Sequence, residues 1–278
     1  MKKINRRSFL AAAGLTVAAL ALTACGGSAS STASSTASSA ASSEAASTSA
    51  AAELTTVEAG KLTMATNAAF PPYEMTTDAG EFEGIDIDTA KAIAEKLGLE
   101  LQIDDMDFDA ALLSVQQGKA DIVMAGVTVT DERKAVMDFS DSYATGIQSI
   151  IVPEGSDIAS PDDLAGKKIG TQRGTTGYIY CSDDFGDDNV VAYDDGLTAV
   201  QALNNGQVDA VVIDNAPAQE FIAANPGLKI LDTSYAEEDY AIGMAKGSSL
   251  EDAVNAALKE LKADGTLQSI VDKYITAE

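Results

Sequence analysis

The chain has 278 residues, with 43 acidic and 18 basic side chains, a formal net charge of −25 and no histidine. This balance argues against binding to nucleic acid and against docking on anionic lipid headgroups, because both require clustered Lys and Arg. The absence of histidine excludes Ser-His-Asp and Cys-His catalysis and His-ligated metal sites, whereas chemistry based on carboxylates stays possible.

The first 24 residues have the features of an export signal. Basic side chains between positions 2 and 7 precede an apolar run over 9–22, and a Leu-Thr-Ala segment leads directly into Cys25. This order resembles the lipobox of bacterial lipoproteins, in which the cysteine is lipidated and becomes the new N-terminus. Residues 5–10 also resemble a twin-arginine signal. An uncleaved membrane helix is disfavoured, because the run is shorter than the roughly 20 residues that span a bilayer.

Residues 25–53 are almost entirely Ser, Ala and Thr. This composition has too little apolar bulk to offset the entropy of ordering the chain, so we expect a flexible linker with a reach of about 30 Å. A lipid on Cys25 would hold the folded part near the membrane through this linker. Cys181 is then the only thiol left, so no internal disulfide and no role for this cysteine are expected.

Residues 54–278 alternate short β-branched runs with helical patterns that end in glycine, which is typical of parallel sheets with crossover helices. The patterns predict a strand over 61–65, a helix over 89–97 and a strand over 99–103. A second helix, capped by Asp107 and ended by Gly118, should lead into a buried strand over 121–125. Helices returning to the first lobe are expected after residue 250.

A segment over 114–124 returns in similar form over 202–212, each copy reading as helix, glycine stop, tight loop and strand. The repeat favours two lobes of similar α/β build, although chance similarity between ordinary αβ units is an open alternative. Open α/β sheets bind ligands outside the carboxyl ends of their strands. Gly126, Thr128 and Asp214 follow the two repeat strands and should therefore face a common cleft.

Arg133 follows Thr130, a good helix N-cap, and the first-turn acids Asp131 and Glu132. Its guanidinium could form a bidentate pair with a carboxylate that comes from outside the protein. It could equally pair with Asp131, Glu132 or Asp138. The residues alone leave these two interpretations open.

Six segments occur in an order that resembles the polar amino-acid substrate-binding proteins of ABC importers. The resemblance extends from about residue 62 to residue 274. The segments are Phe-Pro-Pro-Tyr-Glu at 70–74, Gly-Ile-Asp-Ile-Asp at 84–88, Met-Asp-Phe at 106–108, Ala-Gly-Val-Thr-Val-Thr-Asp-Glu-Arg-Lys at 125–134, Asp-Phe-Ser at 138–140 and Gly-Thr-Thr-Gly at 174–177.

The resemblance implies a two-lobed α/β fold of the periplasmic-binding-protein type II, with a ligand cleft between the lobes. Lobe 1 would comprise 54–147 and 244–278, and lobe 2 would comprise 148–243. The chain should cross between lobes near 146–152 and near 240–245, and two such crossings make a hinge.

The resemblance also implies a site for a zwitterion, which needs a fixed cation, a fixed anion and neutral hydrogen-bonding groups. Arg133 would hold the α-carboxylate and Asp214 the ammonium group. The backbone of Gly126, the hydroxyl and amide of Thr128 and a backbone N–H within 174–176 would complete the carboxylate subsite. The full set of expected ligand-binding residues is Asn67, Phe70, Phe108, Gly126, Thr128, Arg133, Gln172, Thr175, Thr176 and Asp214.

Phe70 and Phe108 would flank the ligand, and Asn67 and Gln172 would lie near its side chain. Two neutral amides there favour a polar, uncharged amino acid, such as glutamine or cystine, over a strongly cationic one. Arg173 could reach an acidic substituent or face solvent. Tyr73 is expected to pack behind Phe70.

The function implied is that of a monomeric, lipid-anchored extracytoplasmic receptor on the outer face of the cytoplasmic membrane. It would capture an L-amino acid and deliver it to the permease subunits of an ABC importer, without catalytic residues, cofactor or metal. Two alternatives stay open. One is a dehydratase-like enzyme on the same fold that acts on a prephenate-like acid, and the other is an amino-acid-sensing lipoprotein.

Overall fold

The computed structural model describes residues 54–275. The predicted signal peptide, the lipid-bearing Cys25 and the predicted linker lie outside the described residues. Within 54–275, none of the helices combines the length and the apolar character that crossing a bilayer demands. Cys181 is buried and is not part of a disulfide.

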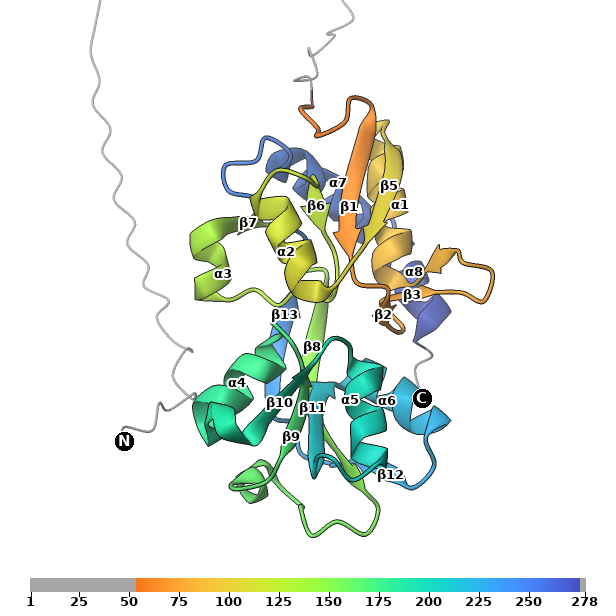
Figure 1. Cartoon of the computed structure of the whole chain (residues 1–278). Helices are drawn as coiled ribbons and strands as arrows, with labels where there is room; N and C mark the ends of the chain where they lie inside the picture. Colours follow the sequence, from red (N-terminus) through yellow and green to blue (C-terminus); the bar gives the residue numbers. More distant parts are fainter. Residues whose placement is uncertain (1–53, 276–278) are drawn as a thin grey trace, which may run out of the picture. The chain divides into compact units, whose positions relative to one another are not determined.

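The first sheet has five strands in the order β5-β1-β6-β14-β7 (Figure 1). β1 runs parallel to β5 and β6, whereas β14 is antiparallel to β6 and β7. Buried Leu62 and Met64 of β1 and Ile122 of β6 form its core. The strands are β1 (Lys61–Thr66), β5 (Glu100–Asp105), β6 (Ile122–Val123), β7 (Met137–Phe139) and β14 (Gly243–Ala245).

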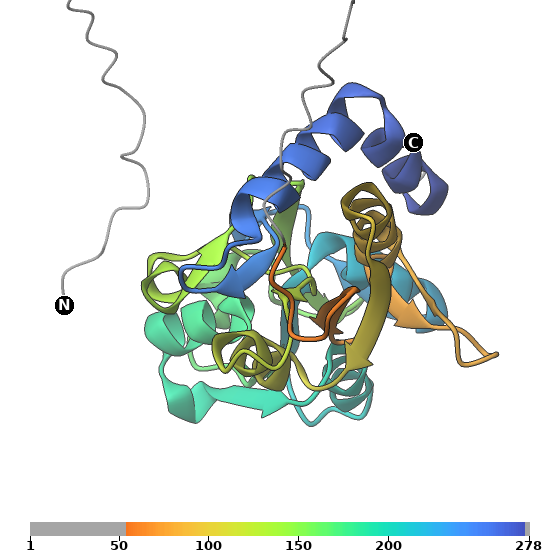
Figure 2. The same ribbon diagram turned by 90° about the horizontal axis from the view of Figure 1, so that it is seen from above.

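Five helices and a small hairpin sheet accompany this first sheet among the described residues. Figure 2 shows α7 and α8, in blue, on the outside beside α1. Lys273 and Tyr274 both donate to Asp88 Oδ2, at 2.7 and 2.8 Å, and so tie α8 to α1. The elements are α1 (Ile85–Leu97), α2 (Phe108–Gln116), α3 (Asp131–Val136), α7 (Glu251–Ala263), α8 (Thr266–Tyr274), β2 (Ala69–Phe70), β3 (Glu74–Thr76) and β4 (Phe82–Glu83).

The second sheet has the order β10-β9-β11-β8-β12, with β13 also paired to β8. Its strands follow one another in the chain and are connected mainly by helices. The strands are β8 (Ala144–Pro153), β9 (Ile169–Gln172), β10 (Val190–Tyr193), β11 (Ala210–Asp214), β12 (Leu228–Ile230) and β13 (Ala236–Tyr240). The helices are α4 (Thr176–Phe185), α5 (Gly196–Asn204), α6 (Asn215–Ala224) and the 3₁₀ turns η1 (Pro161–Leu164) and η2 (Asp187–Asn189).

The two sheets are joined by β8 and β13, which pair antiparallel with Gly146 opposite Glu238 and Ala144 opposite Tyr240. Figure 1 shows this pair running from one sheet toward the other. After β13 the chain enters β14 of the first sheet. The first sheet therefore contains strands from both ends of the described chain, and the second sheet is inserted between them.

The predicted α/β class is confirmed, and so are most of the predicted elements. β1 and β5 match the predicted strands within two residues, and α2 begins directly after Asp107. Both copies of the repeat form helix, turn and strand, and Gly118 and Gly206 share a φ of 66°. The buried strand predicted over 121–125 is shorter, because β6 covers only Ile122–Val123.

The helix predicted over 89–97 begins four residues earlier, at Ile85. The residue before it, Gly84, has a φ of 131°, and a Cβ atom at this position would lie 2.1 Å from the carbonyl oxygen of Tyr73. Only glycine allows this close approach without strain. The start of α1 is therefore determined by the packing of residues 73–74 against Gly84, which local helix signals do not contain.

Candidate functional site

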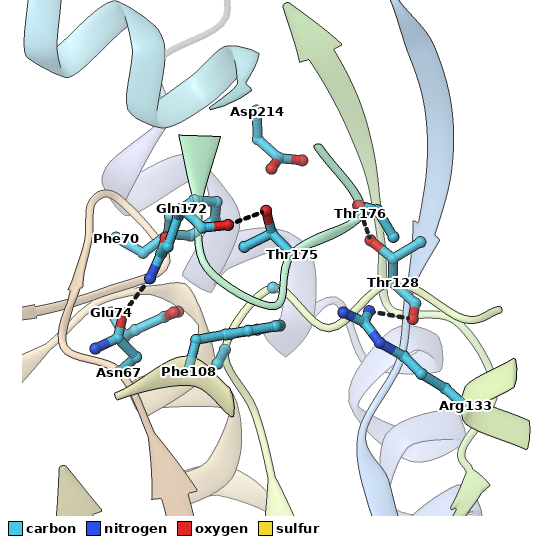
Figure 3. Close-up of a pocket in the computed structure, with 12 residues that line it drawn as sticks. Asn67, Phe70, Glu74, Phe108, Thr128, Arg133, Gln172, Thr175, Thr176 and Asp214 are labelled. Carbon is cyan, nitrogen blue, oxygen red and sulfur yellow. Dashed lines mark hydrogen bonds between the residues drawn. The ribbon is translucent and has the colours of Figure 1, made fainter. Parts of the chain in front are cut away.

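A small cavity of about 20 Å³ lies between the two sheets, and every ligand-binding residue predicted from the sequence lines it (Figure 3). Two lining residues, Glu74 and Ala125, were not predicted. The chain supplies the wall from both sides, since Arg133 follows the first sheet's β6 whereas Gln172 and Asp214 end strands of the second sheet.

Arg133 is held in place by its own helix start, where Thr130 Oγ1 accepts a hydrogen bond from the backbone N–H of Arg133. Arg133 is 8 % exposed, and its guanidinium donates to two carbonyl oxygens, Thr128 O at 2.7 Å and Gly174 O at 3.2 Å. It also lies 5.4 Å from the centre of the Phe108 ring. No salt bridge reaches Arg133 from residues 54–275. Asp138, one of the partners considered from the sequence, pairs with Lys246 at 2.6 Å instead. The guanidinium is therefore a buried cation without a carboxylate partner.

Asp214 is the buried anion of the cavity. Its Oδ2 accepts from Gln148 Nε2 at 2.8 Å, and its Oδ1 accepts from the hydroxyl of Tyr240. Burial raises the pKa of Asp214 to about 7, despite these hydrogen bonds. No salt bridge reaches Asp214 from the described part of the chain, so its charge has no cationic partner there.

The hydroxyls of Thr128 and Thr176 lie 3.5 Å apart and face each other across the cavity (Figure 3). Both donate to Glu238 Oε2 at 3.0 Å. Glu238 belongs to β13 and is 6 % exposed. Glu238 was not predicted from the sequence, because it stands in an acidic run at 237–239 that looks like a solvated surface. The signal in the sequence is its position two residues before Tyr240, which places both side chains on one face of a strand.

Gly126 lies in the cavity wall, but its backbone N–H already donates to Asp86 Oδ2 at 3.0 Å. The contribution expected from the backbone of Gly126 to the carboxylate subsite stays a prediction, and its N–H already has a partner in Asp86. The lack of a side chain at Gly126 leaves room for Phe70, because a Cβ atom here would lie 2.9 Å from the Phe70 ring.

Behind Gly126 lie two fully buried carboxyl groups, Glu74 and Asp86. Burial, together with the charge of Asp86, raises the pKa of Glu74 well above its usual range, and burial raises the pKa of Asp86 to about 6. The carboxyl group of Glu74 shares a hydrogen bond with that of Asp86, and no other donor of the described residues reaches it. Glu74 therefore brings to the cavity a buried carboxyl group that has no cationic partner among the described residues.

Two amide side chains meet across the cavity. Gln172 Nε2 donates to Asn67 Oδ1 at 2.8 Å, and Asn67 Nδ2 donates to Met106 O at 3.0 Å. Arg173 points away from this pair, because it is half-exposed and pairs with Asp194 at 3.4 Å. The interpretation in which Arg173 faces solvent is thus the one that the structure bears out.

The aromatic and hydroxyl residues complete the wall. Phe70 stacks on Tyr73 with ring centres 5.9 Å apart, so Tyr73 packs behind Phe70 as predicted. Thr175 is the N-cap of α4: its Oγ1 accepts from Tyr178 N at 3.3 Å and donates to Gln172 O at 2.8 Å. The described residues contain no cluster of acidic or thiol side chains arranged to hold a metal ion.

Comparison with known proteins identifies the family. Residues 62–277 match the bacterial extracellular solute-binding proteins, family 3. The chain is 32 % identical to a probable histidine-binding protein of Neisseria gonorrhoeae, over 99 % of this chain and 98 % of the relative. It is also 32 % identical to the L-cystine-binding protein TcyJ of Escherichia coli K12, over 80 % of this chain and 85 % of the relative.

Solved structures of amino-acid-binding proteins are also similar to this chain. An ancestral arginine-binding protein bound to arginine is 43 % identical, with a TM-score of 0.74, and covers 78 % of this chain and 98 % of that one. The chain therefore belongs to the bacterial extracellular solute-binding proteins, family 3. The predicted family and the two-lobed fold of type II are confirmed.

Proposed function

We propose that the protein is the substrate-binding receptor of an ABC importer and that it captures an L-amino acid in the cavity between its lobes. The observation that carries this proposal is the pairing of charges in one cavity. Arg133 is a buried cation that pairs with no carboxylate, and Asp214 is a buried carboxyl group that pairs with no cation, among the described residues. A zwitterion supplies both missing partners at once, whereas a simple acid or a simple amine supplies only one.

The carboxylate subsite combines Arg133 with the N-terminus of α4. Arg133 donates to Gly174 O, which lies two residues before the first residue of that helix. The first backbone N–H groups of an α-helix have no partner within the helix and attract anions. The N-cap Thr175 takes the N–H of Tyr178, which leaves the N–H groups of Thr176 and Gly177 for a carboxylate.

The side-chain subsite is formed by Phe70 and Phe108, by the amide pair of Asn67 and Gln172, and by Glu74. The two amides favour a polar, uncharged side chain such as that of glutamine. The buried Glu74 carboxyl, which has no cationic partner among the described residues, favours a second candidate, a guanidinium like that of arginine, because burial of this group is offset best by a cation. Both candidates end in N–H donors, and relatives that bind arginine and relatives that bind glutamine are known.

Capture would close the two lobes around the ligand. We divide them as 54–147 with 244–278 and 148–243, and assign the hinge to the β8–β13 pair. An amino acid that bridges Arg133 and Asp214 makes contacts with both lobes, so it stabilises the closed state selectively. Permease subunits that respond to the closed state would then respond to the loaded receptor.

Anchoring and cellular position are proposed from the sequence and the family. The family consists of extracellular solute-binding proteins, and the lipobox-like segment that ends at Cys25 supports a lipid-anchored position on the outer face of the cytoplasmic membrane. The relatives named above are binding proteins, which supports a receptor over a dehydratase-like enzyme. A sensing lipoprotein would use the same cavity and is separated from a transport receptor by its membrane partner.

The proposal is tested by a thermal-shift screen of the purified protein against the common L-amino acids, L-cystine and a prephenate-like acid, followed by calorimetry. A ligand well above its dissociation constant raises the melting temperature by stabilising only the folded state. We expect arginine, glutamine or a close relative to produce the largest shift. A response to the ring acid alone would favour the enzyme, and no response to any amino acid would contradict the receptor.

A further inference from the structure

Glu238 lies directly behind the cavity and is not one of the residues that line it. It accepts hydrogen bonds from side chains of both lobes. Its Oε2 accepts three hydrogen bonds, from Thr128 Oγ1, Thr176 Oγ1 and Gln148 Nε2, each at 3.0 Å. The other oxygen, Oε1, has no partner among the described residues. Thr128 follows the first sheet and Thr176 opens a helix of the second, so one carboxylate joins both lobes.

The direction of these hydrogen bonds determines what the cavity can bind. A threonine hydroxyl has one proton to donate and two lone pairs that accept. A carboxylate only accepts, so the protons of Thr128 and Thr176 both point at Glu238. The two hydroxyl oxygens, which line the cavity, can then offer only lone pairs to a ligand.

Gln148 extends this pattern to Asp214. Its Nε2 donates both to Glu238 Oε2 at 3.0 Å and to Asp214 Oδ2 at 2.8 Å. One amide therefore bridges the two carboxyl groups, and its donors are turned toward them. Asp214 and the two hydroxyl oxygens together form a stretch of cavity wall that consists of acceptors (Figure 3).

We propose that Glu238 is a positioning residue that makes this stretch of wall selective for a protonated amino group. By holding both threonine protons it prevents Thr128 and Thr176 from donating to a ligand. An ammonium group therefore finds acceptors at this stretch of wall, whereas a carboxylate or keto oxygen finds no donor there. The inference rests on the proposed function, in which Asp214 receives the ammonium group of an amino acid. It also revises the expected part of the Thr128 hydroxyl, which cannot donate to the α-carboxylate while Glu238 holds its proton.

The test compares an amino acid with the analogue that lacks its α-amino group: L-arginine with 5-guanidinopentanoate, and L-glutamine with glutaramate. Calorimetry on the purified full chain gives the ratio of the two dissociation constants, which measures selection for the amino group. In Glu238→Met both threonine protons are free to turn toward the cavity, so we expect the ratio to fall about tenfold or more. Glu238→Gln keeps one accepting oxygen and should give an intermediate ratio.

Glu237→Gln is the matched control, because Glu237 is the exposed neighbour on the same strand. Its ratio should equal that of the wild type. If Glu238 were only structural, its variants would weaken both ligands equally and leave the ratio unchanged, and this result would overturn the inference. If Glu238→Met fails to fold, the effect of Glu238→Gln on the ratio of dissociation constants is measured in a Thr176→Val background. This effect should be smaller than in the wild-type background, because one of the hydroxyls through which Glu238 acts has been removed.

The outcomes for the two proposals are distinct. If the wild type binds no amino acid, the receptor function and this inference both fail. If the wild type prefers the amino acid over its deaminated analogue and the Glu238 variants keep that preference, only the inference fails.

Discussion

Gln172 Nε2 donates to Asn67 Oδ1 at 2.8 Å, and this buried hydrogen bond joins the end of β9 in the second sheet to the segment after β1 in the first. Arg133 makes a second contact of this kind through Gly174 O. The lobes are thus connected directly across the cavity. A hydrogen bond of this type contributes about 1 kcal/mol, which is enough to alter the balance between open and closed states.

Replacement of Gln172 should therefore open the ligand-free protein. We expect Gln172→Ala to have a larger radius of gyration than the wild type in small-angle scattering, with the difference reduced by a saturating ligand. Arg173→Ala is the control, because that side chain is half-exposed and pairs only with Asp194 among the salt bridges of the described residues. Equal radii for Gln172→Ala and the wild type would show that this contact does not hold the lobes together.

Removal of the Arg133 guanidinium should weaken amino-acid binding by several kcal/mol, because a bidentate charge pair with the α-carboxylate is lost. The ligand-free fold should change little, since the two carbonyl oxygens that lose a donor lie at the cavity. Calorimetry of Arg133→Ala measures the loss, and circular dichroism monitors the fold. Lys134→Ala, an exposed neighbour on α3, should bind like the wild type. Undiminished binding by Arg133→Ala would remove Arg133 from the site.

Glu74→Gln separates the two candidates for the ligand side chain. If a guanidinium lies against this carboxyl group, the variant should lose affinity for arginine by about tenfold or more relative to glutamine. The affinities of wild type and variant for both amino acids give the result, with Glu81→Gln as an exposed control on the same hairpin. A ratio that does not change would leave the neutral side chain as the better candidate.

The stability of the ligand-free protein should fall as the pH rises from about 5 to about 7. Burial raises the pKa of Asp214 to about 7 and that of Asp86 to about 6, so the folded state keeps protons that the unfolded chain has already released. Stability declines with pH wherever the folded state binds more protons. The carboxyl groups with lowered pKa, such as Asp138, change the stability only below about pH 5, because above that pH they are ionised in both the folded and the unfolded state.

Melting temperatures of the ligand-free protein across this range measure the effect, at about 2–4 °C for each kcal/mol. Asp214→Asn should flatten the curve, since asparagine does not titrate. A melting temperature that rises between pH 5 and 7, or a curve unchanged in Asp214→Asn, would contradict the assigned pKa shift.

The sequence predicts the parts of the fold that depend on local patterns. The periodicity of residues 61–65 and the glycine at position 98 identify β1 and the end of α1 without tertiary information. The predicted ligand-binding residues meet at one cavity because they end or follow β1, β5, β6, β9 and β11, and open α/β sheets bind ligands at the carboxyl ends of their strands.

What the sequence does not predict is the orientation of acidic side chains. Glu238 lies inside and Glu237 outside because β13 pairs with β8 in the register that places Glu238 opposite Gly146. Asp86 occupies the Gly126 N–H from a helix 40 positions away. Such pairings arise between distant segments, so an acidic run reads as solvated surface until the fold is known.

The place of β14 in the first sheet has a consequence for the order in which the chain folds. β14 lies between β6 and β7, yet it is synthesised after all six strands of the second sheet. The lobe that begins first is therefore the one that is completed last, while its neighbour has every strand it needs by residue 240. A product that ends before residue 243 would contain a finished second lobe and an unpaired edge on β6, and unpaired edges of this kind promote aggregation.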